Sequence, residues 1–263
     1  MNRIIRYRLS SIAATVSLCW WAIQVVSPVE STAVILVVIA SATWVIYPLD
    51  PILDPRDRGP GEGLRSWTTI RLSIAILVFV IALFFLTSEA RTLASIGLPL
   101  AALYAVPFSG IRIKDRSAAK IPFIALAITT ACVGIPWLQS NASVGLDLIL
   151  LVTAMILLVI SNVIVCDFRD RGRDELAGLK TLASTRPHAA IKITRLLFMM
   201  ICFIAWIIAN EPKTSSLGQA LGLLLATLML HIASKKSQQP ILMTLLADGS
   251  MALPALFGML LNK

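Results

Sequence analysis

The sequence predicts an all-α, polytopic membrane protein with about nine transmembrane helices. Of its 263 residues, 57% are hydrophobic and only 14% are charged, and the mean hydropathy is +0.85. Soluble domains carry roughly a quarter charged residues. This chain has too few charges to cover a water-facing surface, but its apolar residues suit a surface that faces lipid. The alternation that marks a membrane β-barrel strand does not occur in the sequence.

Nine apolar runs follow one another along the chain, and each approaches the roughly 20 residues that a helix needs to cross a bilayer. The runs are apolar on all sides, which is typical of helices in lipid. The first contains Trp20 and Trp21 and is too long for a cleaved signal peptide, so we count it as a span. We treat residues 1–263 as one transmembrane domain. The runs are 10–26, 31–47, 70–87, 93–108, 121–138, 144–165, 191–210, 217–234 and 241–261.

The basic residues predict how this domain is oriented. With nine spans, 20 of the 23 Lys and Arg residues fall on one side, and only Arg91, Lys213 and Lys263 fall on the other. The positive-inside rule then places the N-terminus in the cytoplasm and the C-terminus outside, in the inner or plasma membrane if the source is bacterial. The net charge of +9 therefore calls for anionic membrane lipids as partners and for no nucleic acid. A second use for some cations is binding a phosphorylated substrate.

Acidic residues concentrate in the two long cytoplasmic loops that follow the second and sixth spans. These loops hold eight of the 14 acids. Asp50 and Asp54 are four residues apart, as are Asp170 and Asp174, with Asp167 one turn before the second pair. On a helix, residues four apart lie on one face about 5–6 Å from each other, so paired carboxylates there repel unless a cation lies between them.

Magnesium fits this arrangement, because Mg²⁺ prefers one or two carboxylates together with substrate phosphates and water. Two pairs facing each other across a cavity would hold two Mg²⁺ ions and a diphosphate between them. The simpler interpretation of one pair is ordinary charge at a solvated helix end. Two pairs, both at cytoplasmic ends of even-numbered spans, favour a shared site.

The second acidic loop carries the strongest motif of the chain. The stretch DFRDRGRDELAGLKTLAS starts at Asp167 and includes Gly178, Lys180 and Thr181. It resembles the second Asp-rich motif of the UbiA superfamily of intramembrane prenyltransferases, and the stretch that begins at Tyr104 is similar to that family's basic loop. The first motif departs from the family: Ile46 stands where the family has Asn, and Pro51 and Pro55 interrupt the motif. RGPGEGLRS replaces the family's Arg-Pro-rich segment.

This resemblance implies a nine-helix bundle with a central cavity open to the cytoplasm. It implies an enzyme that transfers an isoprenyl group from an isoprenyl diphosphate to a membrane-soluble, aromatic or lipid-like acceptor, with Mg²⁺ as cofactor. Tyr104 would face the allylic carbocation or the acceptor, where a π face is favourable; its alternative role is in an interfacial aromatic belt. The implied metal ligands are Asp50, Asp54, Asp167, Asp170 and Asp174, and the implied diphosphate-binding residues are Arg58, Arg112, Lys114 and Lys180.

Three other functions remain open from the sequence. A catalytically weakened homologue is suggested by Ile46 and the two prolines, and a terpene cyclase would fit the same scaffold. An ion-coupled transporter is disfavoured because transporter acids usually lie near the bilayer midplane, whereas these acids cluster at one interface.

Asp248 in the last span is either an intramembrane functional acid or part of a kinked helix capped by Gly249 and Ser250.

Overall fold

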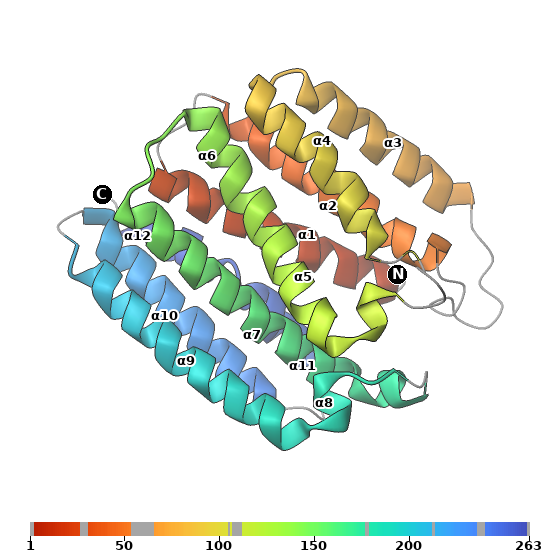
Figure 1. The fold of residues 1–263 in the computed structure, drawn as a ribbon, viewed down its shortest axis with the longest axis vertical. Coiled ribbons are helices and arrows are strands. Elements are labelled where there is room, and N and C mark those ends of the chain that lie inside the picture. Colours follow the sequence, from red (N-terminus) through yellow and green to blue (C-terminus); the bar gives the residue numbers. More distant parts are fainter. Residues whose placement is uncertain are drawn as a thin grey trace.

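The structure is a computed structural model, and its described residues form a bundle of helices with no β-strand among them. Figure 1 shows long helices packed roughly side by side, with the N-terminal half of the chain on one flank and the C-terminal half on the other. The all-α prediction is therefore confirmed for these residues. The described ranges are 3–26, 31–53, 66–104, 106, 112–176, 179–211, 214–235 and 240–261.

Each of the nine apolar runs overlaps one helix or consecutive helices among the described residues. Seven lie in α1 (Arg3–Val26), α2 (Thr32–Leu53), α3 (Ser66–Leu83), α4 (Ser88–Leu103), α7 (Leu146–Leu176), α9 (Pro187–Ala209) and α10 (Thr214–Lys235). The run at 121–138 comprises α5 (Ser117–Thr129), the π-helical turn η3 (Thr130–Gly134) and α6 (Ile135–Ser140). The last comprises α11 (Pro240–Ser250) and α12 (Leu253–Leu260).

Length and composition identify fewer certain spans than nine. Five helical segments of the described chain are long and apolar enough to cross a membrane, or six if α11 and α12, which meet at a 52° bend, form one span. The apolar stretches Thr32–Ile46 of α2 and Thr69–Leu83 of α3 are shorter, and α4 contains Pro99. The count of nine crossings remains a prediction.

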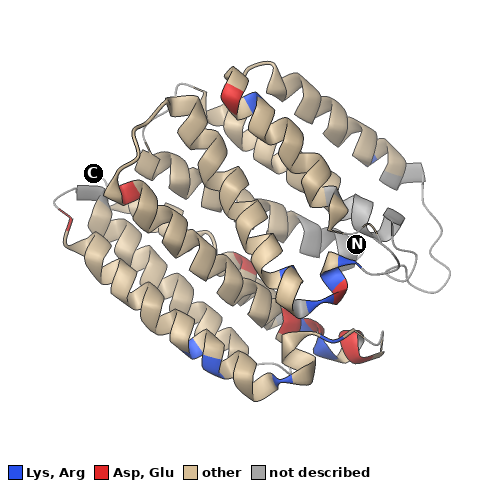
Figure 2. Ribbon diagram, in the orientation of Figure 1, with Lys and Arg blue, Asp and Glu red and all other residues tan. Residues whose placement is uncertain are grey.

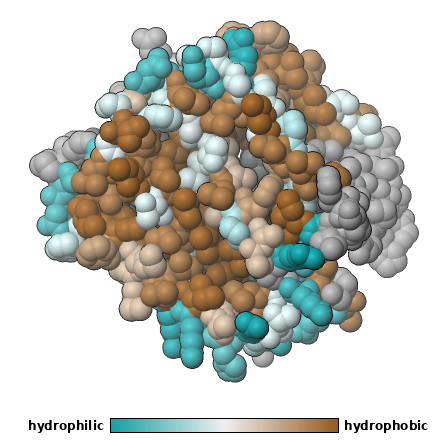
Figure 3. All heavy atoms as spheres, viewed as in Figure 1, coloured by the Kyte–Doolittle hydropathy of each residue, from teal (hydrophilic) through white to brown (hydrophobic). Residues whose placement is uncertain are grey.

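The longest helix, α7, lies at the centre of the packing. It contacts α1, α5, α9, α10 and α11, and Leu151, Met155, Leu158 and Ile164 along it are almost completely buried. The outside of the bundle is apolar instead of polar: Phe85 and Trp206 are 64% and 63% exposed. On the face in Figure 3, apolar residues form a broad band and polar residues gather toward the upper and lower edges. This pattern is typical of a surface that faces lipid.

Two glycines bring α10 and α12 into backbone contact. A Cβ added to Gly218 would lie 2.4 Å from the carbonyl oxygen of Phe257, and one added to Gly222 would lie 2.5 Å from that of Leu253. Their Gly-x-x-x-Gly spacing puts both on one face of α10, where small residues let membrane helices approach closely. The bent C-terminal segment is therefore held against α10 by close packing of the two backbones.

We expect Gly222→Ala to lower the free energy of unfolding by about 1–3 kcal/mol, because a methyl group there forces the two helices apart. Gly97→Ala in α4 is the matched control, since a Cβ at Gly97 meets nothing within 4 Å and alanine favours the helix by up to about 1 kcal/mol. Thermal unfolding in detergent micelles measures both. Equal unfolding temperatures for the two variants would contradict the close packing of α10 and α12.

Candidate active site

The second acidic motif forms the last turns of α7. Its apolar span ends at Gly172, so the three aspartates lie where the helix leaves the apolar part of the bundle. Their spacing of three and four residues puts them on neighbouring positions of one helix face. Asp167 and Asp174 are buried at 1% and 9% exposure, and Asp170 is partly exposed. Figure 2 shows most of the described charged residues gathered at this end of the bundle.

Asp167 is paired with a lysine from a different helix. Its Oδ1 accepts a hydrogen bond from Nζ of Lys120 in α5 at 2.6 Å. Its other oxygen, Oδ2, is buried and accepts no hydrogen bond from the described residues. Buried polar atoms are nearly always hydrogen-bonded, so this open oxygen marks a place where a further donor or cation would fit.

Asp170 is held by its neighbour in the sequence. Arg169 donates to Asp170 from Nε at 3.0 Å and from Nη2 at 2.7 Å, and its Nη1 donates to Oγ1 of Thr244 in α11 at 3.2 Å. Such a two-bond guanidinium–carboxylate pair fixes geometry as well as charge. Arg169 therefore ties the second motif to α11.

Asp248 belongs to the same polar region, one turn beyond Thr244 on α11. It accepts a hydrogen bond from Oγ of Ser10 in α1 at 2.5 Å, and it interacts electrostatically with Arg169. It also lies at the end of α11, just before the 52° bend, and Ser250 donates to the carbonyl of Ala247 there. The predicted kink is therefore present next to Asp248, and the Asp248 side chain additionally joins α1 to the end of α11.

The basic loop after α4 meets the tail of the second motif. Backbone hydrogen bonding pairs Arg116 with Lys180 in an isolated parallel bridge. This bridge brings Lys114, two residues before Arg116 in the short helix η2 (Ile113–Asp115), near the same loop as Lys180. Arg112 is buried at 3% exposure, and its Nε and Nη2 bond to the two oxygens of Asp115 at 2.8 and 2.7 Å. An acid of its own loop thus pairs with Arg112 in this structure.

Tyr104 lies at the end of α4 and is partly buried. Its ring stacks on Phe123 of α5, with centroids 5.7 Å apart and planes inclined by 20°. Phe123 is one turn after Lys120 on α5, so this aromatic pair lies at the end of the bundle that carries the acids. An aromatic surface beside carboxylates suits a site where an organic cation forms.

The first acidic motif is only partly within the described residues. Asp50 lies in α2, but its side chain is not described, and Asp54 and Arg58 fall outside the described ranges. Figure 1 shows that α2 and α7 end at the same end of the bundle. The predicted meeting of the two motifs therefore agrees with the course of the helices, while the distance between their carboxylates remains a prediction.

The described residues do not form a complete metal centre by themselves. Among them, no three His, Cys, Asp or Glu side chains are close enough together to hold a metal ion. A Mg²⁺ ion that also binds substrate phosphates needs only one or two protein carboxylates. The hard oxygen donors of Asp167, Asp170 and Asp174, including the buried open oxygen of Asp167, fit such an ion.

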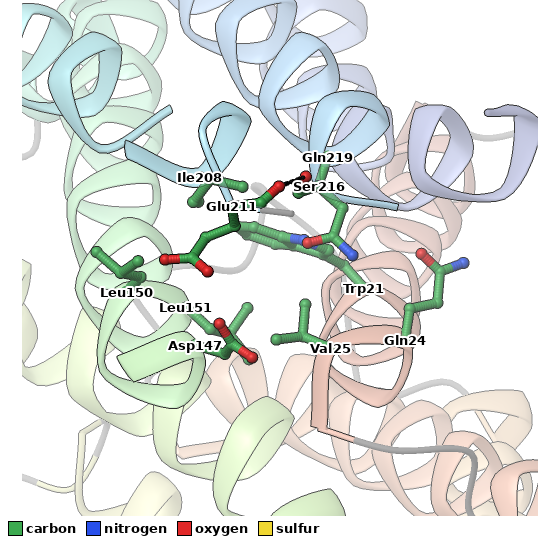
Figure 4. Close-up of a pocket in the computed structure, with 10 residues that line it drawn as sticks. All are labelled: Trp21, Gln24, Val25, Asp147, Leu150, Leu151, Ile208, Glu211, Ser216 and Gln219. Atoms are coloured by element: carbon green, nitrogen blue, oxygen red, sulfur yellow. Dashed lines mark hydrogen bonds between the residues drawn. The ribbon is translucent and has the colours of Figure 1, made fainter. Parts of the chain in front are cut away.

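A cavity of about 80 Å³ lies at the opposite end of the bundle (Figure 4). The side chains around it come from the end of α1, the start of α7, the end of α9 and the start of α10, and they include Trp21, Asp147, Glu211 and Gln219. Asp147 and Asp167 are 20 residues apart on one helix, or about 30 Å. Pockets for organic ligands are about 300–1,000 Å³, so this cavity is too small for an isoprenyl diphosphate.

Two functional candidates were not predicted from the sequence. The sequence predicts no individual role for Lys120 or Arg169, which count there only among the 20 basic residues on the cytoplasmic side. Both make their contacts across the fold, to a residue 47 positions away for Lys120 and 75 positions away for Arg169. The signal available in the sequence was a basic residue directly beside, or in the loop facing, an acidic motif.

Comparison with known proteins identifies the family. The UbiA prenyltransferase family matches residues 60–241, which is more than half of the chain. No curated protein matches the chain in sequence. Solved structures with a similar fold include a UbiA homologue from Archaeoglobus fulgidus bound to Cd²⁺, with a TM-score of 0.69 and 14% identity over 99% of each chain.

The same homologue bound to GPP and Mg²⁺ has a TM-score of 0.67 and 13% identity, over 97% of this chain and 99% of that one. A structure described as addressing digeranylgeranylglyceryl phosphate synthase in membranes has a TM-score of 0.61 and 12% identity over 99% of each chain. At such low identity these likenesses concern the fold. Together with the family match, they confirm the resemblance of the second motif: the chain belongs to the UbiA prenyltransferase family.

Proposed function

We propose that this protein is a Mg²⁺-dependent intramembrane prenyltransferase that moves an isoprenyl group from an isoprenyl diphosphate to a membrane-soluble, aromatic or lipid-like acceptor. The observation that carries the proposal is that two of α7's three aspartates, Asp167 and Asp170, pair with basic side chains at one end of an apolar bundle. Family membership and the GPP and Mg²⁺ found in a structurally similar homologue support the choice of substrate and metal.

Each group has a physical role in this proposal. Asp170 and Asp174, with Asp50, Asp54 and Asp167, would hold Mg²⁺, which draws negative charge from the leaving diphosphate when it is bound. Lys114 and Lys180, brought to neighbouring loops by the Arg116–Lys180 bridge, would bind the diphosphate oxygens together with Arg58 and Arg112. Such cations stabilise the leaving group most strongly where water is scarce.

The aromatic pair, Tyr104 and Phe123, would contact the isoprenyl part of the substrate. Tyr104, stacked on Phe123, would present its ring or its hydroxyl to the allylic cation or to the acceptor. The prenyl chain would lie among apolar helices, whose outward faces are rich in exposed Phe, Leu and Ile. The active site would open to the cytoplasm, because the charges that favour the cytoplasmic side gather around it.

Turnover by the purified protein tests this proposal. Isoprenyl diphosphates of several chain lengths are incubated with the protein and Mg²⁺, with and without a membrane lipid extract, and the release of diphosphate is followed. Release that requires both Mg²⁺ and the extract supports transfer to a lipid-soluble acceptor. Release without any acceptor, accompanied by a cyclised hydrocarbon, supports a terpene cyclase instead.

A further inference from the structure

Lys120 and Arg169, which both pair with aspartates of α7, differ in how they are held. Within the described part of the chain the ammonium of Lys120 bonds to Asp167 alone. The guanidinium of Arg169 makes three hydrogen bonds, two to Asp170 and one to Thr244. A lysine is a compact point charge on a flexible four-carbon stem with three rotatable donors. Lys120 can therefore leave its partner without breaking other contacts, whereas Arg169 cannot.

Lys120 hydrogen-bonds to only one of the two carboxylate oxygens of Asp167. The Asp167 side chain is 2% exposed, yet its Oδ2 lacks any hydrogen bond from the described residues. A buried carboxylate with one open oxygen is costly unless a further donor or cation approaches it. Oδ2 of Asp167 can therefore still accept a further donor or cation beside the lysine.

We propose that Lys120 is a mobile counter-ion, which neutralises Asp167 while the metal is absent and binds the substrate diphosphate once Mg²⁺ takes Asp167. This inference rests on the proposed function. Mg²⁺ and an ammonium beside one carboxylate repel each other strongly at low dielectric, and the arriving diphosphate offers Lys120 new anionic partners. The buried carboxylate and the diphosphate are each neutralised at every stage.

The proposal predicts shifts of opposite sign in Lys120→Gln. Without substrate, Mn²⁺ used as a paramagnetic substitute for Mg²⁺ should bind about tenfold more tightly, because its competitor for Asp167 is gone. Inorganic diphosphate, offered with saturating Mg²⁺, should bind about tenfold more weakly, because an ammonium that pairs with it is missing. Electron paramagnetic resonance measures free Mn²⁺, and equilibrium binding of labelled diphosphate measures the second constant.

Two further variants show whether Lys120 is a mobile counter-ion or only part of a structural ion pair. Lys192→Gln removes the same charge from an exposed position of α9, and both affinities should stay within about twofold. Lys120→Arg keeps a cation on Asp167, so Mn²⁺ binding should not tighten. Weaker binding of both ligands by Lys120→Gln, or no change in either, would show that Lys120 only holds α5 against α7. If the parent protein binds neither Mn²⁺ nor diphosphate, the proposed function fails, and this inference fails with it.

Discussion

Asp170→Asn and Asp174→Asn should each lower Mg²⁺-dependent turnover of an isoprenyl diphosphate by at least about a hundredfold. An amide keeps the size and shape of the side chain but removes the charge that Mg²⁺ requires. The diphosphate would then develop its negative charge in a poorly neutralised, low-dielectric pocket. Steady-state diphosphate release under saturating Mg²⁺ measures the effect.

Asp147→Asn is the matched control for these two variants. Asp147 lies at the other end of α7, beside the small cavity of Figure 4, and its replacement should leave turnover within about twofold. Full activity in both Asp170→Asn and Asp174→Asn would show that the second motif does not carry the chemistry, and the prenyltransferase proposal would be wrong for this chain.

A related change tests whether the enzyme is weakened. Ile46 in α2 stands where the family has an asparagine, so Ile46→Asn adds a neutral oxygen ligand without changing the charge of the site. In an active enzyme the change should leave turnover equal or raise it. Activity that appears only in Ile46→Asn, with none in the parent, would identify the natural protein as a catalytically weakened homologue.

The second large effect is expected on stability. Arg169→Met removes a guanidinium that bonds to Asp170 and Thr244 and interacts with Asp248, so both acids lose the positive charge of Arg169. The two paired side chains are 20% and 25% exposed. We therefore expect Arg169→Met to lower the free energy of unfolding by about 2–3 kcal/mol, somewhat less than breaking a fully buried pair would.

Arg171→Met supplies the comparison, because Arg171 bonds to Glu175 at 2.8 Å on the same helix. That pair is 45% and 50% exposed, and an exposed pair four residues apart contributes only about 0.3–0.5 kcal/mol. Unfolding experiments in detergent measure the free energy of unfolding of both variants. Equal losses would mean that Arg169 does not tie α7 to α11, and that the second motif is positioned by apolar packing alone.

The sequence predicted the helices well because the signal for a membrane helix is local. Most described residues of the apolar runs are helical, since a backbone in lipid must satisfy its hydrogen bonds within the segment. The ends of the helices were less predictable than the helices themselves. The run at 144–165 became α7, which continues to Leu176, because polar residues can prolong a helix beyond the apolar layer. The bend between α11 and α12 follows Asp248, where the sequence had suggested a kink.

Most contacts between helices could not be predicted from the sequence. Gly218 and Gly222 have the Gly-x-x-x-Gly spacing, but which partner they approach depends on how the whole C-terminal segment folds back. The second acidic motif was found because its aspartates lie on one continuous helix. The pairing of Lys120 with Asp167 was not found, because it joins two helices whose relative rotation no local pattern specifies.

The most direct test of the central claim is Mg²⁺-dependent binding of an isoprenyl diphosphate to Asp54→Ala and Asp174→Ala. These residues belong to different motifs, 120 positions apart. If the motifs share one metal–diphosphate site, the parent binds only with Mg²⁺, and each variant loses binding to a similar extent. Binding by the parent in the presence of EDTA, or loss in Asp174→Ala with none in Asp54→Ala, would contradict a shared site.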